Sequence, residues 1–324
     1  MPQASNIDGV LIQWGDRLFY PGNRVVKTKP QPKLGAGAAR QRAAAIRERI
    51  EATVVRRAPQ VMVKVTGGGR GMKAIAAHFR YINKNGRLDI EDERGETMRG
   101  KDTLPELADD WRFGGTLIDD IGDRREAFNI MLSTPRGTDP LTVQRAAREF
   151  AKIELVDHKY VMVLHDHQAN PHVHISVRAE SKHGKRLNPR KGDLHRWRET
   201  FAEKLRDWGV EAEATRQATR GRNRNYDPLW RIKAREDGRL RTGQSAIKTG
   251  ARARLARVEA VEAWRQIAYA LAESGDKSNR ELSASISAYV RDMPVFDSPA
   301  RDVRNQARPQ PTRDTVVRDA GDRR

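Results

Sequence analysis

Two β-type runs that enclose a histidine-rich segment constrain the fold of this chain more than any other feature. Residues 160–164 (YVMVL) and 173–177 (VHISV) are rich in apolar and β-branched side chains, and a short polar segment separates them. Two such runs joined by a polar loop predict a β-hairpin. A hairpin is antiparallel, so the pattern favours an antiparallel sheet around it.

Four of the chain's eight histidines lie within this hairpin, at its loop end. His172 and His174 alternate along one run, so their side chains share a face of the strand. His165 ends the preceding run and is expected opposite them. Three imidazoles could then converge on one ion and leave positions open for a substrate oxygen, as in catalytic metal sites. A surface histidine tract is the alternative, but the flanking strands favour a metal site, with His167 in a supporting or solvent-exposed position.

The surrounding residues predict an α+β domain with a central antiparallel sheet and flanking helices. Further strands are indicated at 61–65 and 128–132. A glycine-rich turn at 67–71 leads into a helix that carries apolar side chains at helical spacing and ends near Asn85-Gly86. A second helix starts at Pro140 behind the capping residue Asp139, and a third is expected over 193–208.

Four regions are predicted along the 324 residues: a basic N-terminal arm at 1–58, the α+β domain at 59–226, a helical region at 227–297 and a disordered, arginine-rich tail at 298–324. In the arm, residues 10–14 and 18–20 are expected to form a small hairpin. Residues 38–55 are expected to form a helix that is too polar to nucleate a core. The helical region contains an apolar stripe over 251–273, and residues 276–294 are expected to add another helix.

The composition restricts the chemistry and the partners. A net charge of +19 favours a polyanion such as nucleic acid or an anionic membrane surface. The chain has no cysteine, so any metal site must use His, Asp, Glu or backbone oxygen. No apolar run is long enough to cross a bilayer, and residues 1–8 lack the features of a signal peptide. We therefore expect a soluble cytoplasmic protein without membrane insertion.

Tyr81 is a candidate nucleophile because a three-histidine site is suited to polarising a phosphate for attack by a side chain. It lies about 120° from the apolar stripe of its helix and need not be buried. Arg80 and Lys84 lie nearby in sequence and could stabilise a phenolate or hold a phosphate. Tyr81 could instead simply be a boundary packing residue, and spacing alone favours that interpretation.

A basic segment follows the histidine strand directly. We expect it at the rim of the histidine site, where it would neutralise DNA phosphates and make binding salt-sensitive. The residues assigned to this role are Lys182, Lys185, Arg186, Arg190 and Lys191.

Taken in order, these motifs resemble the HUH relaxases of conjugative and mobilisable elements, in particular the branch of the T-DNA border endonucleases. The resemblance runs from Gln60 to Arg222 and rests on FRYINKNG at 79–86, LSTPRGTDP at 132–140 and the spacing His-(six residues)-His-Val-His. It implies that Tyr81 is the nucleophile and that Ser133 contacts DNA near the nick. It also implies that His165, His172 and His174 bind the metal. Position 167, where family members often have Asp, is His.

The resemblance implies a mechanism in which Tyr81 attacks a scissile phosphate at an origin of transfer, giving a 5′-phosphotyrosine and a free 3′-hydroxyl. The cofactor is expected to be Mg²⁺ or Mn²⁺, although imidazole ligands suit Zn²⁺ at least as well as Mg²⁺. The implied partners are single-stranded origin DNA, accessory relaxosome proteins and a type IV coupling protein. The resemblance also implies transfer with the DNA of a plasmid or integrative element into a recipient cell.

Two other functions remain open at this point. A rolling-circle replication initiator would use the same chemistry, but its tyrosine typically follows the histidines, whereas Tyr81 precedes them. A non-catalytic, basic DNA-binding accessory protein would use the histidines only structurally. Loss of covalent attachment in Tyr81→Phe, with binding retained, would separate the enzyme from the accessory protein.

Overall fold

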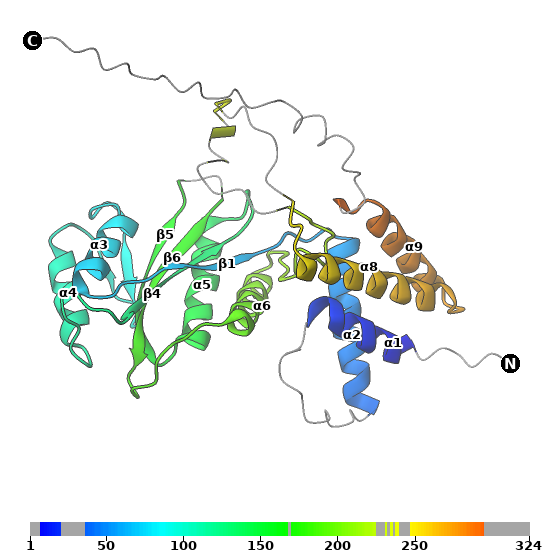
Figure 1. Ribbon diagram of the computed structural model, residues 1–324, viewed down its shortest axis with the longest axis horizontal. Helices are drawn as coiled ribbons and strands as arrows, with labels where there is room; N and C mark the ends of the chain where they lie inside the picture. Colours follow the sequence, from blue (N-terminus) through cyan, green and yellow to red (C-terminus); the bar gives the residue numbers. More distant parts are fainter. Residues whose placement is uncertain are drawn as a thin grey trace, which may run out of the picture.

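The computed structural model describes residues 7–20, 36–167, 170–224, 231, 234–235, 237–239 and 247–294 (Figure 1). The tail predicted to be disordered, 298–324, lies outside these residues, as does much of 227–246. Among the described helices, none combines the length and the apolarity that crossing a bilayer requires.

A six-stranded antiparallel sheet forms the centre of the α+β domain, in the order β1-β4-β6-β5-β2-β3. Its strands are β1 (Met62–Gly67), β2 (Ile90–Asp92), β3 (Thr97–Met98), β4 (Ala127–Ser133), β5 (His158–His165) and β6 (His172–Ser181). The predicted fold class is confirmed, and each strand predicted within the α+β domain overlaps one of these. The short strand β2 and the short edge strand β3 were not predicted, because they lie in an acidic region without apolar alternation.

One face of the sheet packs against α5 (Pro140–Glu154) and α6 (Lys191–Asp207) (Figure 1). The strands contribute their alternate apolar residues, such as Val173, Ile175 and Val177 of β6, which are all fully buried. Helix α5 begins as predicted, with the Asp139 carboxylate accepting a hydrogen bond from the Thr142 amide at 2.8 Å. This core fixes the side of β6 that faces α5 and α6, and it leaves the histidines on the opposite side of the strand.

The opposite face packs against α3 (Met72–Ile82) and α4 (Thr103–Phe113). Helix α3 buries Met72, Ile75, Phe79 and Ile82, the apolar residues that its sequence spacing singles out. Phe79 meets Trp111 of α4 edge-to-face, with ring centroids 4.9 Å apart. The apolar stripe therefore holds α3 on the face of the sheet that carries the histidines.

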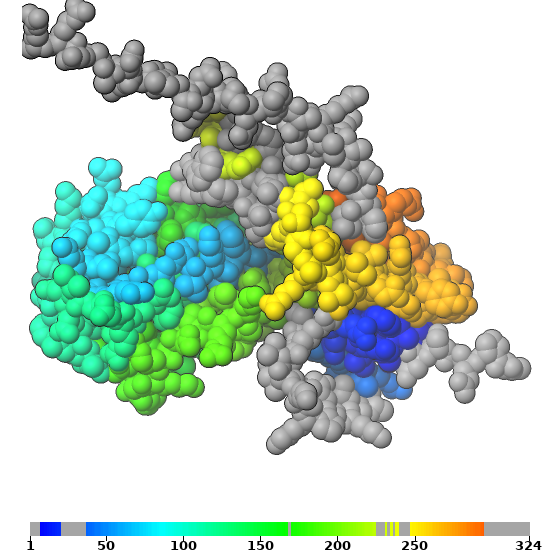
Figure 2. Space-filling model, viewed as in Figure 1, coloured from blue at the N-terminus to red at the C-terminus, as the bar shows by residue number. Residues whose placement is uncertain are grey.

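A second apolar cluster joins helices from both ends of the chain. Figure 2 shows the blue N-terminal residues next to the yellow and orange C-terminal residues, at the end of the molecule opposite the cyan residues. It contains α1 (Ile7–Phe19), α2 (Ala36–Val54), α8 (Ala251–Ala272) and α9 (Lys277–Arg291). The predicted helix at 38–55 is confirmed, but the expectation that it cannot support a core is wrong. Its larger apolar residues Ile46, Ile50 and Val54 recur at intervals of four, so they lie on one side of the helix, and all three are buried.

The hairpin predicted between residues 10 and 20 is also wrong, because this segment forms α1. Leu11 and Leu18, seven residues apart, lie on one helical face and are buried in the second cluster. Gly15 is inside the helix rather than in a turn. A Cβ added there would lie 2.2 Å from Cγ2 of Ile46, so the glycine allows α1 and α2 to approach closely. The boundaries of the four regions given in the sequence analysis stay a prediction.

A buried arginine links this helical cluster to the α+β domain. Arg49 of α2 pairs with Glu213 at 3.0 Å and with Glu199 of α6 at 3.0 Å. Because Arg49 and Glu213 are both buried, removing one partner would leave an uncompensated charge. The contact therefore holds α2 against the domain that carries the histidines.

Trp264→Ala is expected to lower the free energy of unfolding by about 3–5 kcal/mol, because this fully buried ring packs against Phe19 and donates a hydrogen bond to the Thr219 carbonyl. Tyr269→Ala, on the exposed side of the same helix, should change it by less than about 0.5 kcal/mol. Urea denaturation followed by circular dichroism measures both values. Equal stability of the two variants would contradict the packing of α1 against α8.

Candidate active site

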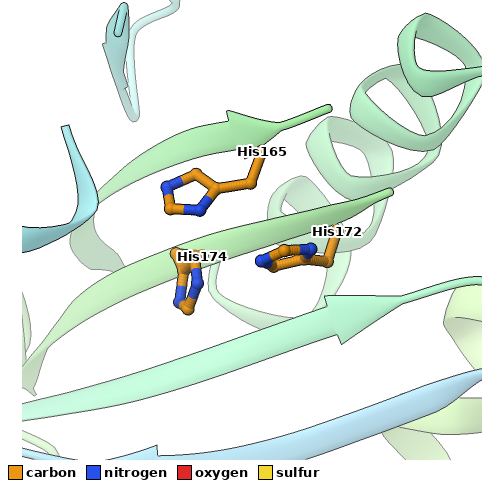
Figure 3. Close-up of side chains that lie close together, drawn as sticks. All are labelled: His165, His172 and His174. Atoms are coloured by element: carbon orange, nitrogen blue, oxygen red, sulfur yellow. The ribbon is translucent and has the colours of Figure 1, made fainter. Parts of the chain in front are cut away.

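Three imidazoles converge where β5 ends and β6 begins, as Figure 3 shows. His165 pairs across the hairpin with His172, and His174 follows two residues later on the same face of β6. The ring centroids lie between 4.6 and 5.0 Å apart. One ring nitrogen from each residue lies within 4.8 Å of the others, a separation that could accommodate one metal ion.

Backbone carbonyl groups orient two of the three rings. Nε2 of His165 lies 2.6 Å from the Ile82 carbonyl oxygen, and Nδ1 of His172 lies 3.0 Å from the Asn170 carbonyl oxygen. A carbonyl oxygen can only accept, so each of these nitrogens carries the proton. The lone pairs of His165 Nδ1 and His172 Nε2 are thereby left for a ligand, as in many metal-binding histidines.

Burial keeps the three rings neutral. It lowers the pKa of His165 to about 4 and that of His174 to about 3, and the neighbouring imidazoles add to both shifts. The pKa of His172 is lowered as well, mainly by burial. Neutral imidazoles are the form that binds metal, so the site needs no deprotonation at neutral pH.

The residues present fit a divalent metal. Nδ1 of His174 is buried and has no hydrogen-bond partner among the described residues, so this ring lacks the polar contact that the other two rings have. No carboxylate joins the three histidines in the described part of the chain. A donor set of three imidazoles suits Mn²⁺ or Zn²⁺ at least as well as Mg²⁺ and leaves coordination positions open.

Tyr81 lies beside this trio. It is in the last turn of α3, its ring centroid is 6.2 Å from that of His174, and 68% of the residue is exposed. Ile82 follows Tyr81 in the chain, and its carbonyl accepts a hydrogen bond from His165, which ties the end of α3 to the three histidines. The phenol is therefore close to the histidines and open to solvent, rather than buried as a packing residue.

Ser133 and Lys84 are also brought to the site. Ser133 ends β4 and pairs directly with His172, so both side chains lie on the same face of the sheet. Lys84 lies just beyond α3, close enough for its charge to contribute to the lowered pKa of His165 and of His172. Arg80 neighbours Tyr81 on α3 and is exposed.

His78 is a site residue that the sequence analysis missed. It lies one helical turn before Tyr81, with ring centroids 5.9 Å apart and the rings stacked. Its ring is also 6.5 Å from that of His174. Burial lowers the pKa of His78 to about 4. The signal that could have found it is its spacing of three residues from Tyr81, which places both on one side of α3.

The expected position of Lys182, Lys185 and Arg186 at the rim of the histidine site is wrong. The histidines lie at the start of β6, and these residues follow its end, about 30 Å away at ~3.3 Å per residue. Arg186 pairs with Glu126 and Glu180. The prediction failed because an extended strand separates residues that are close in sequence, so the two ends of β6 lie far apart.

Arg190 and Lys191 begin the next helix. Arg190 is the residue that caps the N-terminus of α6, where its amide donates to the Asp193 carboxylate at 2.9 Å. Lys191 is the first residue of that helix. His167, in contrast, lies near the metal ligands, with its ring centroid 5.3 Å from that of His165.

A family model described as "Relaxase: MobA/VirD2-like, nuclease domain" matches residues 81–210. The matched span is about two fifths of the chain and contains Tyr81, Ser133 and the three histidines. Residues 81–210 are therefore similar to the nuclease domain of the MobA/VirD2-like relaxases, which confirms the resemblance seen in the sequence.

No curated protein matches the chain. Among solved structures, one described as the molecular basis of vancomycin resistance transfer in Staphylococcus aureus is 16% identical. The match covers 48% of this chain and 98% of that chain, with a TM-score of 0.29. A likeness at this level supports no inference about function.

The affinity for Mn²⁺ is expected to fall by less than about fivefold between about pH 7.5 and about pH 5.5, because the lowered pKa values of the histidines keep protons from competing. Three histidines with ordinary pKa values of about 6.5 would lose roughly 1000-fold over the same interval. Isothermal titration calorimetry on the metal-stripped protein distinguishes the two. The steep dependence would contradict the buried, neutral trio.

Proposed function

We propose that this chain is a DNA relaxase that nicks one strand at an origin of transfer and stays covalently attached to the 5′ end. The observation that carries the proposal is the exposed phenol of Tyr81 beside the imidazole of His174, with ring centroids 6.2 Å apart. A phenol in this position could act as a nucleophile beside a cluster that could hold a metal, which supports the proposal. The match to a relaxase nuclease domain supports the same activity.

The reaction we propose is a transesterification in which Tyr81 is the nucleophile. Its phenolic oxygen attacks the scissile phosphorus, a new O–P bond forms, and the bond from phosphorus to the 3′ oxygen of the preceding nucleotide breaks. The departing oxygen gains a proton and becomes a free 3′-hydroxyl, while the phosphate remains on Tyr81. One phosphodiester replaces another, so the same site can rejoin the strand by the reverse reaction.

The residues around Tyr81 have distinct roles in this scheme. His165, His172 and His174 would hold a divalent metal, Mg²⁺ or Mn²⁺ with Zn²⁺ as a third possibility, which when bound supplies Lewis-acid polarisation of the phosphate. The Ser133 hydroxyl, on the strand next to His172, would contact the DNA near the nick. Arg80 and Lys84 would attract phosphates on the exposed side of α3.

The basic residues beyond β6 would act on DNA farther from the nick. Lys182 pairs with Asp157 and Arg186 pairs with two glutamates, so their charges are partly compensated. We assign Lys182, Lys185 and Arg186, together with Arg190 and Lys191, to sequence-independent phosphate contacts. Removing one of them should weaken binding uniformly and reduce its salt dependence.

The cellular setting follows from the activity. A relaxase acts on single-stranded DNA in the bacterial cytoplasm, so accessory relaxosome proteins would open the duplex at the origin. A type IV coupling protein would then pass the relaxase, with its attached strand, to a recipient cell. The DNA would belong to a plasmid or an integrative element, and the family of the nuclease domain supports this setting.

Tyr81→Phe is expected to abolish the covalent adduct and to leave DNA affinity within about threefold, because only the attacking oxygen is removed. The substrate is a pool of labelled single-stranded oligonucleotides that tile the DNA flanking the gene, incubated with Mn²⁺ and resolved on a denaturing gel. Tyr269→Phe is the matched control, since Tyr269 is also 68% exposed but lies on α8. An adduct that persists in Tyr81→Phe would show that Tyr81 is not the nucleophile.

Removing the metal is expected to slow nicking by about 100-fold or more, since Lewis-acid polarisation is worth several kcal/mol. Excess EDTA, with activity restored by added Mn²⁺, tests this on the wild-type protein. His174→Ala should show the same loss without recovery at moderate Mn²⁺. Unchanged nicking in EDTA would remove the metal from the mechanism while leaving the role of Tyr81 intact.

A further inference from the structure

The hydrogen bonds around the three proposed metal ligands are complete for two of them and incomplete for the third. His165 donates to the Ile82 carbonyl, and His172 donates to the Asn170 carbonyl. Nδ1 of His174 is buried and has no partner among the described residues. Metal-binding histidines almost always donate their second ring N–H to an acceptor, so His174 needs one.

His78 presents a matching unpaired atom. Its Nε2 is also buried without a hydrogen-bond partner in the part of the chain that the structure describes. The two rings are neighbours, with centroids 6.5 Å apart and planes at 75°. A buried polar atom without a partner costs about 1–3 kcal/mol, so two such atoms in adjacent rings are a substantial cost that one mutual hydrogen bond removes.

We infer that His78 is the hydrogen-bond acceptor that positions His174 for metal binding. In this arrangement Nε2 of His174 faces the ion, its Nδ1–H donates to Nε2 of His78, and Nδ1 of His78 carries the other proton. The structure records no hydrogen bond between the two nitrogens, so forming it would require the His78 side chain to rotate toward His174. The inference rests on the proposed function, because it requires that the three histidines bind a metal.

His78 would also connect the metal ligands to the nucleophile. Its ring stacks on that of Tyr81 with an interplanar angle of 29°, and both side chains project from α3. Helix α3 would then meet the trio at two points, the His78 side chain against His174 and the Ile82 carbonyl against His165. His78 is therefore a positioning residue that sets the distance between the phenol and the ion.

The test is the Mn²⁺ affinity of the metal-stripped, full-length protein, measured by isothermal titration calorimetry without DNA. His78→Phe keeps a ring that can stack on Tyr81 but removes the acceptor, and it should weaken Mn²⁺ binding about 10–100-fold. His78→Gln retains a side-chain oxygen that can accept the hydrogen bond, so its affinity should stay within about threefold of wild type. His183→Phe, an exposed histidine beyond the far end of β6, is the control and should not change the affinity.

Thermal unfolding without metal shows whether each variant is folded, and if His78→Phe is not, His78→Ala takes its place against His78→Gln. Wild-type affinity in the Phe or Ala variant would overturn the inference, and so would an equal loss in the Gln variant. A wild-type protein that binds no Mn²⁺ would overturn the proposed metal site together with this role of His78. If Mn²⁺ binding follows the expected order but no adduct forms, His78 keeps its role and the proposed nicking activity fails.

Discussion

The pairing of His165 with His172 across the β5–β6 hairpin is the constraint on which the site depends. Side chains alternate between the faces of a strand, so a slip of one residue in this register would turn His165 or the His172–His174 pair into the apolar core. The register is fixed by burial on the other face, where Val173 and Ile175 pack against α5 and α6. The apolar core on one face of the sheet thus aligns the three polar rings on the other face.

Helix α3 converts this trio into a candidate catalytic site. Its apolar stripe, including Phe79, anchors it on the histidine face, while the side of the helix with His78 and Tyr81 turns toward the rings. The Ile82 carbonyl completes the contact by accepting a hydrogen bond from His165. Packing and polar contacts of one helix therefore act together, and they hold an exposed phenol beside a cluster of neutral imidazoles.

Sequence patterns predicted the features that depend only on residues close together in the chain. Alternation identified the strands and placed His172 and His174 on one face, and helical spacing identified α3. The failures involve contacts between segments that are distant in sequence. Residues 10–20 have the pattern of a hairpin, but they form a helix that packs Leu18 against α2 and α8. His78 can be identified as a site residue only once the fold brings it beside His174. The basic turn after β6 was wrongly predicted to lie beside the histidines, because the length of β6 separates the two ends of the strand.

The most direct test of the account is mass spectrometry of the peptide that becomes attached to DNA. The wild-type protein is incubated with Mn²⁺ and an oligonucleotide that it cleaves, digested with protease and nuclease, and searched for a peptide carrying a nucleotide phosphate. The account predicts one modified peptide, with the phosphate on Tyr81. A phosphate on another residue, or cleavage that leaves no covalent product, would contradict the claim that this phenol and the three imidazoles form one site.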